Sequence, residues 1–455
     1  RDRSVSRGLG DVYKRQHFKQ EGRSSYDAAL AGMHKASGVI ASSAATTFFG
    51  FLSLCAMAFL IGADMGVVLA KGIVFSFLSV LFLLPVMVLL SEKLLQRTAH
   101  RKFLPSFDKF AKWCMRLSIP FTLIAALIVV PAFLGSRNTE YVYGASGFVE
   151  PGSQLYEDTE LIEETFNASG QCAVLVPEGQ WGKEKELVAA LDTLPHVSSI
   201  TSYVTTVSER IPTDMVPPAS LESLISGGYS RIIIATDLRG ESPEAFELVQ
   251  RIRDLCQLYY PDEAKLVGST VTSYDMSLIV NDDSARVLFA SIIAIGLVLL
   301  LMFRSLSIPL ILLLTIESSI WINLAIPYFA GETIQYIGYL IISAIMLGAT
   351  VDYTIILTRS YLDKRRVQPK RQAITEAISR SAITILTSAT ILTLCGAFIG
   401  LISSNGVIAS LGTLIGRGAF IAALNTFLLL PMLFMIFDRV IEKTTLGTHF
   451  YKQPY

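Results

Sequence analysis

The chain has 455 residues, of which 52% are hydrophobic and 17% are charged, and its formal net charge at pH 7 is zero. A mean hydropathy of +0.51 departs from the soluble average toward the membrane class, which excludes an ordinary soluble domain. We expect no nucleic-acid partner, and the five His and five Cys form no metal-ligand cluster in the sequence.

The first sixteen residues are interpreted as a non-native leader. Residues 1–16, RDRSVSRGLGDVYKRQ, begin without Met and resemble translated sequencing-adapter read-through. We exclude them from the fold prediction. The alternative is a short basic cytoplasmic leader.

About eight apolar runs are long enough to be membrane-spanning helices, because hydrocarbon about 30 Å thick needs about 20 apolar residues per helix. In chain order they are Ser37 to Ile61, Gly66 to Leu90, Leu117 to Gly135, Val287 to Phe303, Ile308 to Phe329, Ile334 to Leu357, Ser381 to Ile402 and Val407 to Phe437. The sequence therefore predicts an α-helical polytopic membrane protein with about eight spans.

Lys and Arg in the short loops predict the orientation, because positive charge is retained on the cytoplasmic side. The N-terminal stretch and the loops before the third and seventh spans are basic, whereas the turns at Asp64, Glu332 and Asn405 carry neither Lys nor Arg. Eight crossings satisfy all of these loops with both termini, including a tail at residues 444–455, in the cytoplasm. We expect a multi-pass protein of a bacterial plasma membrane.

The long insert between the third and fourth spans is predicted to lie outside the cytoplasm. Residues 136–286 contain 24 acidic residues against 10 basic ones. Their patterns run strand, helix, strand, strand, helix, strand, as in a split ferredoxin-like α+β domain. The predicted strands are Gln171 to Pro177, Val197 to Val204, Arg231 to Asp237 and Lys265 to Ser269, and the predicted helices are Lys183 to Leu194 and Pro243 to Tyr259, with an earlier helix at Ser153 to Phe166.

Two further features of this insert are predicted. The segment Thr205 to Gly228, with Pro212, Pro217, Pro218 and Gly227, is typical of a long loop that could line or cover a passage. Cys172 and Cys256 could form a disulfide in an oxidising compartment, but two free thiols are the favoured interpretation.

Two stretches about 345 residues apart, Ala28 to Leu90 and Ala373 to Ile436, share the order of their features. In each, a Ser/Thr/Ala-rich helix and a short turn precede a helix that carries Lys71-Gly72 or Arg417-Gly418 and ends in Leu-Leu-Pro. Such pairs suggest two parallel half-proteins related by an axis along the membrane normal.

The repeat also predicts the domain organisation. Residues 17–116 would hold the last two spans of the first half and a cytoplasmic linker, and residues 117–135 the first span of the second half. After the external insert, residues 287–443 would form a five-helix bundle. The chain would thus be a C-terminal fragment that lacks the first half's external domain and its four leading spans.

Asp352, inside the sixth apolar run, is the residue on which the functional prediction depends. A charged aspartate at mid-helix costs at least roughly 2.5 kcal/mol on insertion scales, so it is a functional-site candidate. Binding a proton would discharge it, remove most of that cost and let its helix shift. Gly348, four residues earlier on the same face, would leave room for a neighbouring helix or water. The alternative is a carboxylate held in a fixed polar contact.

The motif Gly348 to Tyr353, GATVDY, precedes a basic loop and a Ser/Thr-rich span. This combination resembles the fourth helix of a half-repeat in the resistance-nodulation-division transporters, and more narrowly the MMPL branch. The resemblance covers Phe18 to Lys443 and includes a sterol-sensing-like motif in the bundle. It implies export driven by the proton gradient, with the aspartate carrying protons and with lipidic or amphipathic substrates. The family's matching Asp-Tyr in its first half is absent from this chain.

Other polar residues of the spans are candidates for supporting roles. Tyr353 could pass a proton or only pack, since one residue of rotation turns it to a different face from Asp352. Glu317 lies at a similar depth, about 10 to 14 Å from the inner boundary at ~1.5 Å rise per residue, so it could share a polar pathway or only bond to its neighbours. Hydroxyls of the seventh span could hydrate Asp352 or satisfy their own helix. These hydroxyls belong to Thr387, Ser388 and Thr390.

Lys71 and Arg417 occupy matched places in the repeat, toward the outer halves of their spans. The helical rise leaves about 10 Å or more of depth between them and Asp352, so a direct ion pair is not expected. Their matched positions favour a paired structural or gating role. The alternative is snorkelling to the outer headgroups.

Three functions remain after these observations. The first is a proton-driven transporter that exports a lipid-like compound, since no phosphate-binding Gly-x-x-x-x-Gly-Lys-Ser/Thr loop exists for direct ATP coupling. The others are a non-transporting sterol-sensing-like receptor and a protein-translocation accessory, because fold does not fix function. No nucleophile, base and orienter set points to an enzyme. The expected partners are the bilayer, protons and a hydrophobic substrate, with a homo-oligomer left open and no cofactor.

Overall fold

The computed structural model describes residues 25–91, 106–139, 141–144, 154–165, 170–208, 210–211, 215–238, 241–447 and 450–451. The predicted leader at residues 1–16 lies outside the described residues. The chain forms two compact units: a helical unit of Arg1–Tyr141, Asp283–Ser403 and Val407–Tyr455, and an α+β unit of Val142–Asp282 with Ser404–Gly406.

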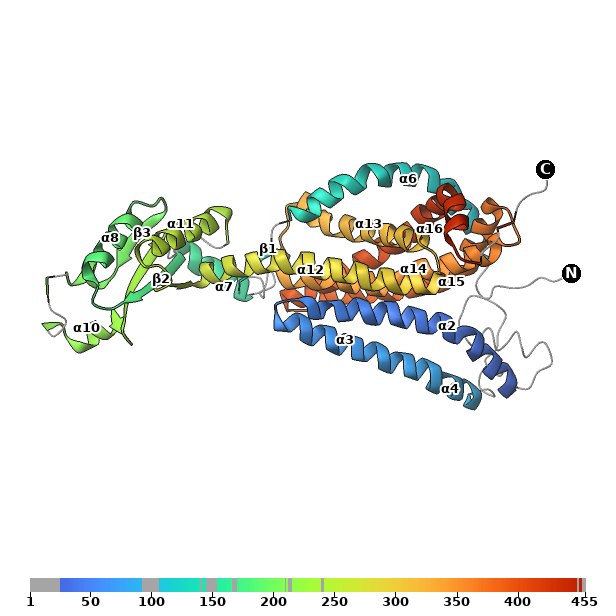
Figure 1. Cartoon of the computed structure of the whole chain (residues 1–455), viewed down its shortest axis with the longest axis horizontal. Helices are drawn as coiled ribbons and strands as arrows, with labels where there is room; N and C mark the ends of the chain where they lie inside the picture. Colours follow the sequence, from blue (N-terminus) through green and yellow to red (C-terminus); the bar gives the residue numbers. More distant parts are fainter. Residues whose placement is uncertain are drawn as a thin grey trace. The chain divides into compact units, whose positions relative to one another are not determined.

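The helical unit consists of long apolar helices (Figure 1). They are α2 (Ser25–Leu52), η1 (Ser53–Ala56), α3 (Leu60–Leu78), η2 (Ser79–Leu83), α4 (Leu84–Leu90), α6 (Asp108–Arg137), the second part of α12 (Ser269–Phe303), α13 (Ser307–Ala330), α14 (Tyr336–Arg365), α15 (Lys370–Ile402) and α16 (Gly406–Thr444), with the short strand β7 (Ile334–Gln335) before α14. Seven described segments are long and apolar enough to cross a membrane, and the apolar helix Ile40–Ala56, formed by the later part of α2 and by η1, is shorter. The expected polytopic helical membrane protein is confirmed.

The turn between the first two predicted spans lies earlier than the sequence predicted. α2 ends at Leu52 and α3 already begins at Leu60, so Asp64, predicted in the turn, lies within a helix. The Asp283 carboxylate fixes this position, because its Oδ2 accepts hydrogen bonds from the backbone nitrogens of Ala58 at 2.8 Å and Phe59 at 3.4 Å. These amides stand at the start of α3, where helix donors lack partners within the helix.

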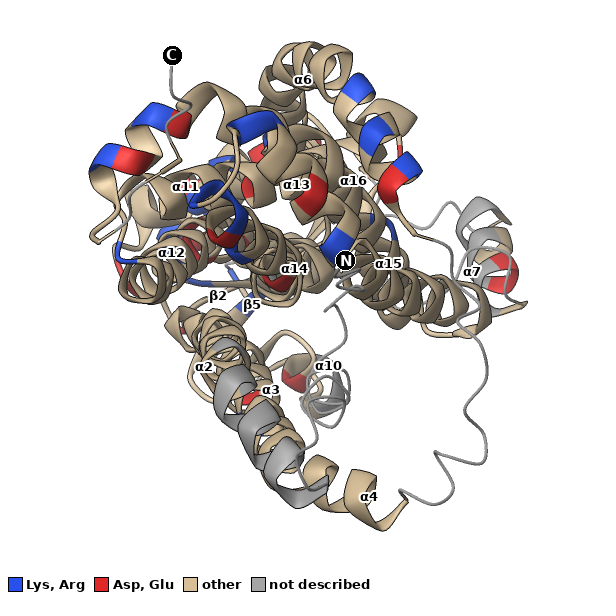
Figure 2. Ribbon diagram, turned by 90° about the vertical axis from the view of Figure 1, so that its right-hand side faces the viewer, with Lys and Arg blue, Asp and Glu red and all other residues tan. Residues whose placement is uncertain are grey.

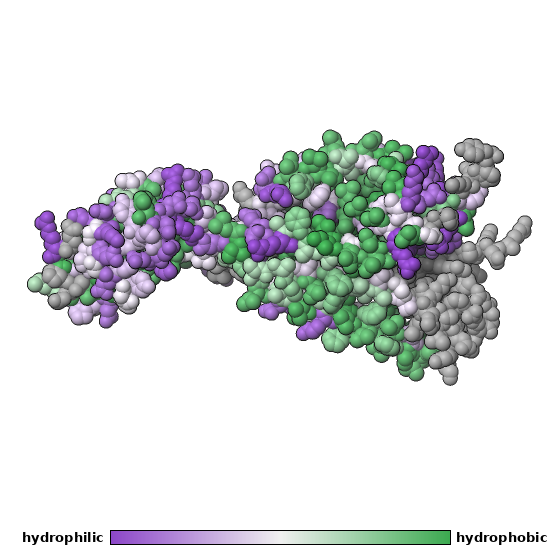
Figure 3. Space-filling model, viewed as in Figure 1, coloured by the Kyte–Doolittle hydropathy of each residue, from purple (hydrophilic) through white to green (hydrophobic). Residues whose placement is uncertain are grey.

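The core of the helical unit lies around α13 and α14. In the most apolar stretches of α13 and α14, 78% and 71% of the residues are buried, whereas none is buried in the most apolar stretch of the span Leu60–Leu90. α2 and α3 lie together at one edge of the unit, with α2 beside α14 (Figure 2). Hydrophobic side chains cover much of the face of this unit seen in Figure 3, as expected for a surface in contact with lipid.

Glycines bring α15 and α16 close together. A Cβ atom added to Gly396 on α15 would lie 2.5 Å from the backbone nitrogen of Gly416 on α16, and one added to Gly412 would lie 2.8 Å from the nitrogen of Gly400. The two backbones therefore approach more closely than side chains would allow. This is the small-residue packing typical of membrane helices.

The α+β unit has one antiparallel sheet in the order β3-β5-β2-β6, with β4 paired to β5. Its elements are α7 (Gln154–Thr165), β2 (Gly170–Pro177), α8 (Trp181–Asp192), β3 (Val197–Thr201), α9 (Tyr203–Thr206), α10 (Pro218–Glu222), β4 (Ile225–Ser226), β5 (Tyr229–Thr236), α11 (Pro243–Tyr259) and β6 (Lys265–Gly268). Side chains of β2 and β5 alternate between buried and less buried positions, so one face of the sheet packs on the core with α8 and α11.

The segment predicted as the loop Thr205 to Gly228 is more structured than expected. It contains the end of α9, the helix α10 and the strand β4. The strand before it is shorter than predicted, because Ser202 and Thr205 form a capping box that starts α9. Within the segment itself, prolines at the N-terminus favour the helix α10, and pairing with β5 forms the strand β4.

Both cysteines of the α+β unit are free and buried, which confirms the favoured interpretation of two free thiols. Burial raises the pKa of Cys172 to about 11 and that of Cys256 to about 12. The thiols are therefore neutral and unreactive at neutral pH.

Candidate functional site

Asp352 on α14 is hydrogen-bonded to α2. The Ser43 hydroxyl donates to Asp352 Oδ1 at 2.5 Å, and one turn away the Thr47 hydroxyl donates to the carbonyl of Gly348 at 3.0 Å. Residues four apart lie on the same face of a helix. The two bonds therefore mark one continuous contact between the helices, with Asp352 at one end of it.

Two glycines bring the helices close at this contact. A Cβ atom added to Gly50 on α2 would lie 3.2 Å from the Cα of Gly348, and one added to Gly348 would lie 3.5 Å from the carbonyl oxygen of Thr47. Gly348 thus lies against a neighbouring helix, and that helix is α2. The close approach is what allows the short Ser43 side chain to reach the carboxylate.

Tyr353 points away from this contact into the core of the helical unit. Its side chain is 1% exposed, and its hydroxyl has no hydrogen-bond partner among the described residues. Asp352 itself is only partly buried.

The hydroxyls of α15 do not support Asp352 in the way that the sequence predicted. Thr387, Ser388 and Thr390 are exposed on the surface of the unit, and the hydrogen bond to Asp352 comes from Ser43 instead. The sequence pointed to the span that follows Asp352 in the chain. The observed donor lies 309 positions away in sequence, in the other of the two stretches predicted to be repeats.

Glu317 is a second carboxylate within the helical unit. It lies on α13, is 4% exposed, and neither of its oxygens has a hydrogen-bond partner among the described residues. The predicted neighbours Ser318, Ser319 and Asn323 are buried on the same helix but bond to other groups. No hydrogen bond among the described residues joins Glu317 to Asp352.

The matched cations Lys71 and Arg417 have different surroundings. Arg417 on α16 donates from Nε to Asn323 Oδ1 at 2.8 Å and from Nη2 to the Asn323 carbonyl at 2.9 Å. It is bound to α13 within the unit, which argues against snorkelling, and it does not pair with Asp352.

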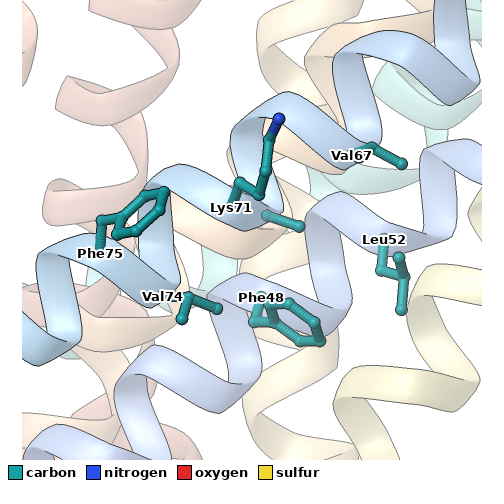
Figure 4. A pocket seen from close by; sticks show the side chains of 7 residues that line it. Phe48, Leu52, Val67, Lys71, Val74 and Phe75 are labelled. Atoms are coloured by element: carbon teal, nitrogen blue, oxygen red, sulfur yellow. The ribbon is translucent and has the colours of Figure 1, made fainter.

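Lys71 is exposed beside an apolar groove between α2 and α3, with a volume of about 220 Å³ (Figure 4). Phe48 and Leu52 line the groove from α2, and Val74 and Phe75 line it from α3. No hydrogen bond or ion pair of Lys71 is seen within the described part of the chain. The repeat therefore does not give the two cations equivalent contacts in this chain.

Three polar groups of the helical unit were not among the predicted site residues. Ser43 was noted only as part of the repeat, Asn425 on α16 is 1% exposed and bonds to Ser319, and Asp438 pairs with Arg365. An amide in the middle of an apolar run was the available signal for Asn425. A basic residue and an acid at the ends of two spans were the signal for Arg365 and Asp438.

Comparisons with known proteins agree with the resemblance that the motif suggested. The MMPL family model matches residues 12–117 and 148–449, which is most of the chain. The probable transport protein MmpL8 of Mycobacterium bovis is 27% identical over 267 residues, which cover 56% of this chain and 23% of the relative. The sulfolipid-1 exporter MmpL8 of Mycobacterium tuberculosis is 26% identical over 267 residues, with the same coverage.

A third relative covers more of the chain. The putative membrane protein ActII-3 of Streptomyces coelicolor is 23% identical over 442 residues, which are 93% of this chain and 54% of the relative. The chain therefore spans about a quarter to about half the length of the curated relatives it matches.

Proposed function

The chain belongs to the MMPL family of multi-pass bacterial membrane proteins, and from that premise we propose that it forms part of an exporter of lipidic or hydrophobic compounds that is driven by the proton gradient. One observation carries the proposal: the Asp352 carboxylate lies between two helices of the helical unit, with Ser43 Oγ donating to it at 2.5 Å. Carboxylates within membrane helices are costly and mark ion or proton paths.

In the proposed cycle Asp352 takes up and releases a proton. While it is ionised, it accepts a charge-assisted hydrogen bond from Ser43, which is roughly twice as strong as a neutral one. A proton on the carboxylate removes the charge and weakens that bond. Because Gly50 and Gly348 bring the two backbones together at the same contact, the change alters how α2 packs on α14.

Tyr353 and Glu317 are the other members of the proposed relay. The buried Tyr353 hydroxyl has no hydrogen-bond partner among the described residues, so it can donate or accept during a transfer. Glu317 supplies a second buried carboxylate on α13, a helix packed against α14. Proton transfer among the three groups would run through water, since water can bridge polar groups that do not touch.

The family and the relatives support the proposed substrate class. One relative is named as an exporter of sulfolipid-1, and for this chain we propose the broader class of lipid-like or hydrophobic compounds. The α+β unit would be a ferredoxin-like domain outside the cytoplasm, with both termini inside. Its sheet order β3-β5-β2-β6 supports the ferredoxin-like fold. The acidic composition of residues 136–286 supports a position outside the cytoplasm.

The test is gradient-driven efflux of a fluorescent lipid analogue from vesicles that contain the intact exporter to which this chain belongs. We expect Asp352→Asn to abolish efflux and to leave expression unchanged, because the amide cannot carry a proton. The matched control is Asp363→Asn, an exposed acid on the same helix, which should retain efflux. Undiminished efflux in Asp352→Asn would contradict the relay, and a wild-type protein without gradient-dependent efflux would favour the sensing or accessory functions.

A further inference from the structure

The first turns of α6 carry a row of exposed cations. The row consists of Lys109, Lys112 and Arg116, and no hydrogen bond or ion pair of these side chains is seen in the part of the chain that the structure describes. At about 100° of rotation per residue, the three positions fall within about 60° of one another around the helix axis. Lys and Arg gather at this end of α6 in Figure 2. One face of the helix therefore presents all three positive charges.

This face points away from the helices on which α6 packs. α6 contacts α13 and α15, and the buried residues of its first turns, Ala111, Cys114 and Ser118, lie on the opposite side of the helix from the cations. The acid of the first turn, Asp108, is held by α15, because the Ser379 hydroxyl donates to its Oδ1 at 2.8 Å. The cationic face thus has a net positive charge, and it lies on the side of the helical unit away from α2 and α3 (Figure 1).

Trp113 lies on the same face, and its ring is held in place. The side chain is 55% exposed. Its ring stacks on Phe110 with the centroids 6.3 Å apart, and Phe110 in turn meets Phe427 of α16 edge to face at 5.3 Å. Tryptophan is enriched at the membrane–water interface, where its ring contacts hydrocarbon and its N–H donates to polar groups. Trp113 therefore places the row of cations at the level of the lipid headgroups.

Beyond Arg116 the same face of α6 becomes apolar. Its exposed residues are each at least 54% exposed, and they are Ile119, Leu123, Ile124, Leu127, Val130 and Leu134. At ~1.5 Å rise per residue, the part from Ile119 to Leu127 alone is about 12 Å long. One leaflet contributes about 15 Å of hydrocarbon. The cations are therefore followed, on one face, by an apolar surface as long as most of a lipid chain.

This order of chemical groups fits one class of ligand. A soluble anion such as free phosphate would use the cations and leave the apolar surface unused. A neutral lipid would use the apolar surface and leave the cations unused. An anionic phospholipid uses both, because its phosphate meets the positive charges while its acyl chains lie along the helix. Basic residues next to a membrane span attract anionic lipids in this way.

We propose that the outer face of α6 binds an anionic phospholipid of the surrounding bilayer. Lys109, Lys112 and Arg116 hold the phosphate group, Trp113 packs at the boundary of headgroup and hydrocarbon, and the acyl chains lie on the apolar surface that begins at Ile119. The bound lipid is part of the bilayer and not the exported substrate. A protein that exports nothing would still bind it, and failure of the efflux test would leave this proposal standing.

The experiment uses the full chain in lipid vesicles, with Trp181→Phe and Trp321→Phe so that Trp113 is the one tryptophan left. Phospholipids with brominated acyl chains quench its fluorescence when they lie beside it. The vesicles consist of phosphatidylcholine, with a small fraction replaced by brominated phosphatidylglycerol, which is anionic, or by brominated phosphatidylcholine. We expect the anionic lipid to bind beside Trp113 at least about tenfold more tightly than the neutral one, because each cation near the membrane surface favours an anionic lipid about fivefold.

Removing the three cations should remove this preference. The variant that combines Lys109→Gln, Lys112→Gln and Arg116→Gln should bind the two brominated lipids equally. Arg116→Gln alone should lower the preference about fivefold, and it tests the site if the triple variant does not enter vesicles. Equal binding of the two lipids by the wild type, or an unchanged preference in the triple variant, would overturn the proposal.

The matched control removes three exposed cations from the same end of the helical unit, after α14, at the start of α15 and near the end of α16. It combines Arg366→Gln, Arg371→Gln and Lys443→Gln, and it should keep the preference of the wild type. A second arm adds inorganic phosphate, with NaCl at equal ionic strength as its reference. Phosphate should not displace the brominated anionic lipid, and displacement would assign the cations to a soluble anion and overturn the proposal.

Discussion

The Asp438 carboxylate on α16 accepts two hydrogen bonds from the Arg365 guanidinium on α14, from Nε to Oδ1 and from Nη2 to Oδ2, each 3.0 Å long. Tyr361, one turn earlier on α14, donates to the same Oδ1 at 2.5 Å and stacks on Phe434. Arg365 and Asp438 are 8% and 6% exposed. This buried pair fixes one end of the helix that carries Asp352 to the last helix of the unit.

Removing one member of that pair should destabilise the helical unit. Asp438→Ala leaves the Arg365 charge buried and uncompensated, which costs about 3–5 kcal/mol for pairs of this kind. Chemical unfolding of the chain in detergent would measure the loss. The control is Glu247→Ala, which removes the exposed pair with Arg251 on α11 and should cost less than about 1 kcal/mol. Equal losses in the two variants would contradict the assigned importance of the buried pair.

Ser43 and Ser42 form a matched pair of variants on α2. Ser43→Ala removes the hydrogen bond to Asp352 and should lower the initial rate of gradient-driven efflux about tenfold, because hydrogen bonds to charged groups contribute about 1.5–3 kcal/mol. The Ser42 hydroxyl donates to the Gly38 carbonyl of its own helix, so Ser42→Ala should leave the rate close to that of the wild type. The vesicle efflux assay measures both rates, and similar rates in the two variants would speak against a role for Ser43.

Gly50 and Gly72 test the close contact of α2 with α14. A Cβ atom at Gly50 would meet the Gly348 backbone at 3.2 Å, so Gly50→Ala should destabilise the unit by about 1–3 kcal/mol, the usual cost of overpacking. A Cβ atom at Gly72 meets nothing within 4 Å, so Gly72→Ala should be neutral or stabilising by up to about 1 kcal/mol. Thermal unfolding in detergent compares them, and a neutral Gly50→Ala would show that α2 does not pack closely there.

Glu184 should make the stability of the α+β unit depend on pH. Burial raises its pKa above the ordinary value of 4.5, although the Val204 backbone amide and the Ser230 and Ser202 hydroxyls partly oppose the shift. The folded unit therefore binds a proton more tightly than the unfolded chain does. The stabilisation that comes from this tighter proton binding is present in full below pH 4.5, and it is lost as the pH rises through the pKa of Glu184 in the folded unit.

The measurement is urea unfolding of the full chain at a series of pH values from about 4 upward, recorded on the α+β unit. The stability of the wild type relative to Glu184→Gln should fall as the pH rises above 4.5. The exposed neighbour Glu186 gives the control, since Glu186→Gln should follow the wild type across the range. A difference between wild type and Glu184→Gln that does not vary with pH would contradict the prediction.

Features that depend only on a short stretch of sequence were predicted correctly. The helix α11 has the bounds that the sequence predicted, Pro243–Tyr259, because Ser242 caps it, Pro243 opens it and its apolar residues recur at helical spacing. The Asp352 position was found in the same way, since a carboxylate inside an apolar run is visible in a short window.

Contacts between distant segments could not be predicted from such windows. Ser43 and Asp352 are 309 positions apart, and only packing brings them together. The turn before α3 was misplaced for a similar reason, because the carboxylate that fixes it belongs to Asp283 on another helix. Asn425 bonds to Ser318 and Ser319 more than a hundred positions away, so its orientation becomes known only when both helices are placed.

The glycine contact between α15 and α16 has a mechanical consequence. At Gly396 and Gly416 the two backbones are already closer than a methyl group permits, so sliding one past the other would collide main chain with main chain. On this reading α15 and α16 would move together as one body. In the proposed cycle, the movement that follows protonation of Asp352 would then take place between α14 and α2, where the Ser43 hydroxyl donates to Asp352 and the Thr47 hydroxyl donates to the Gly348 carbonyl.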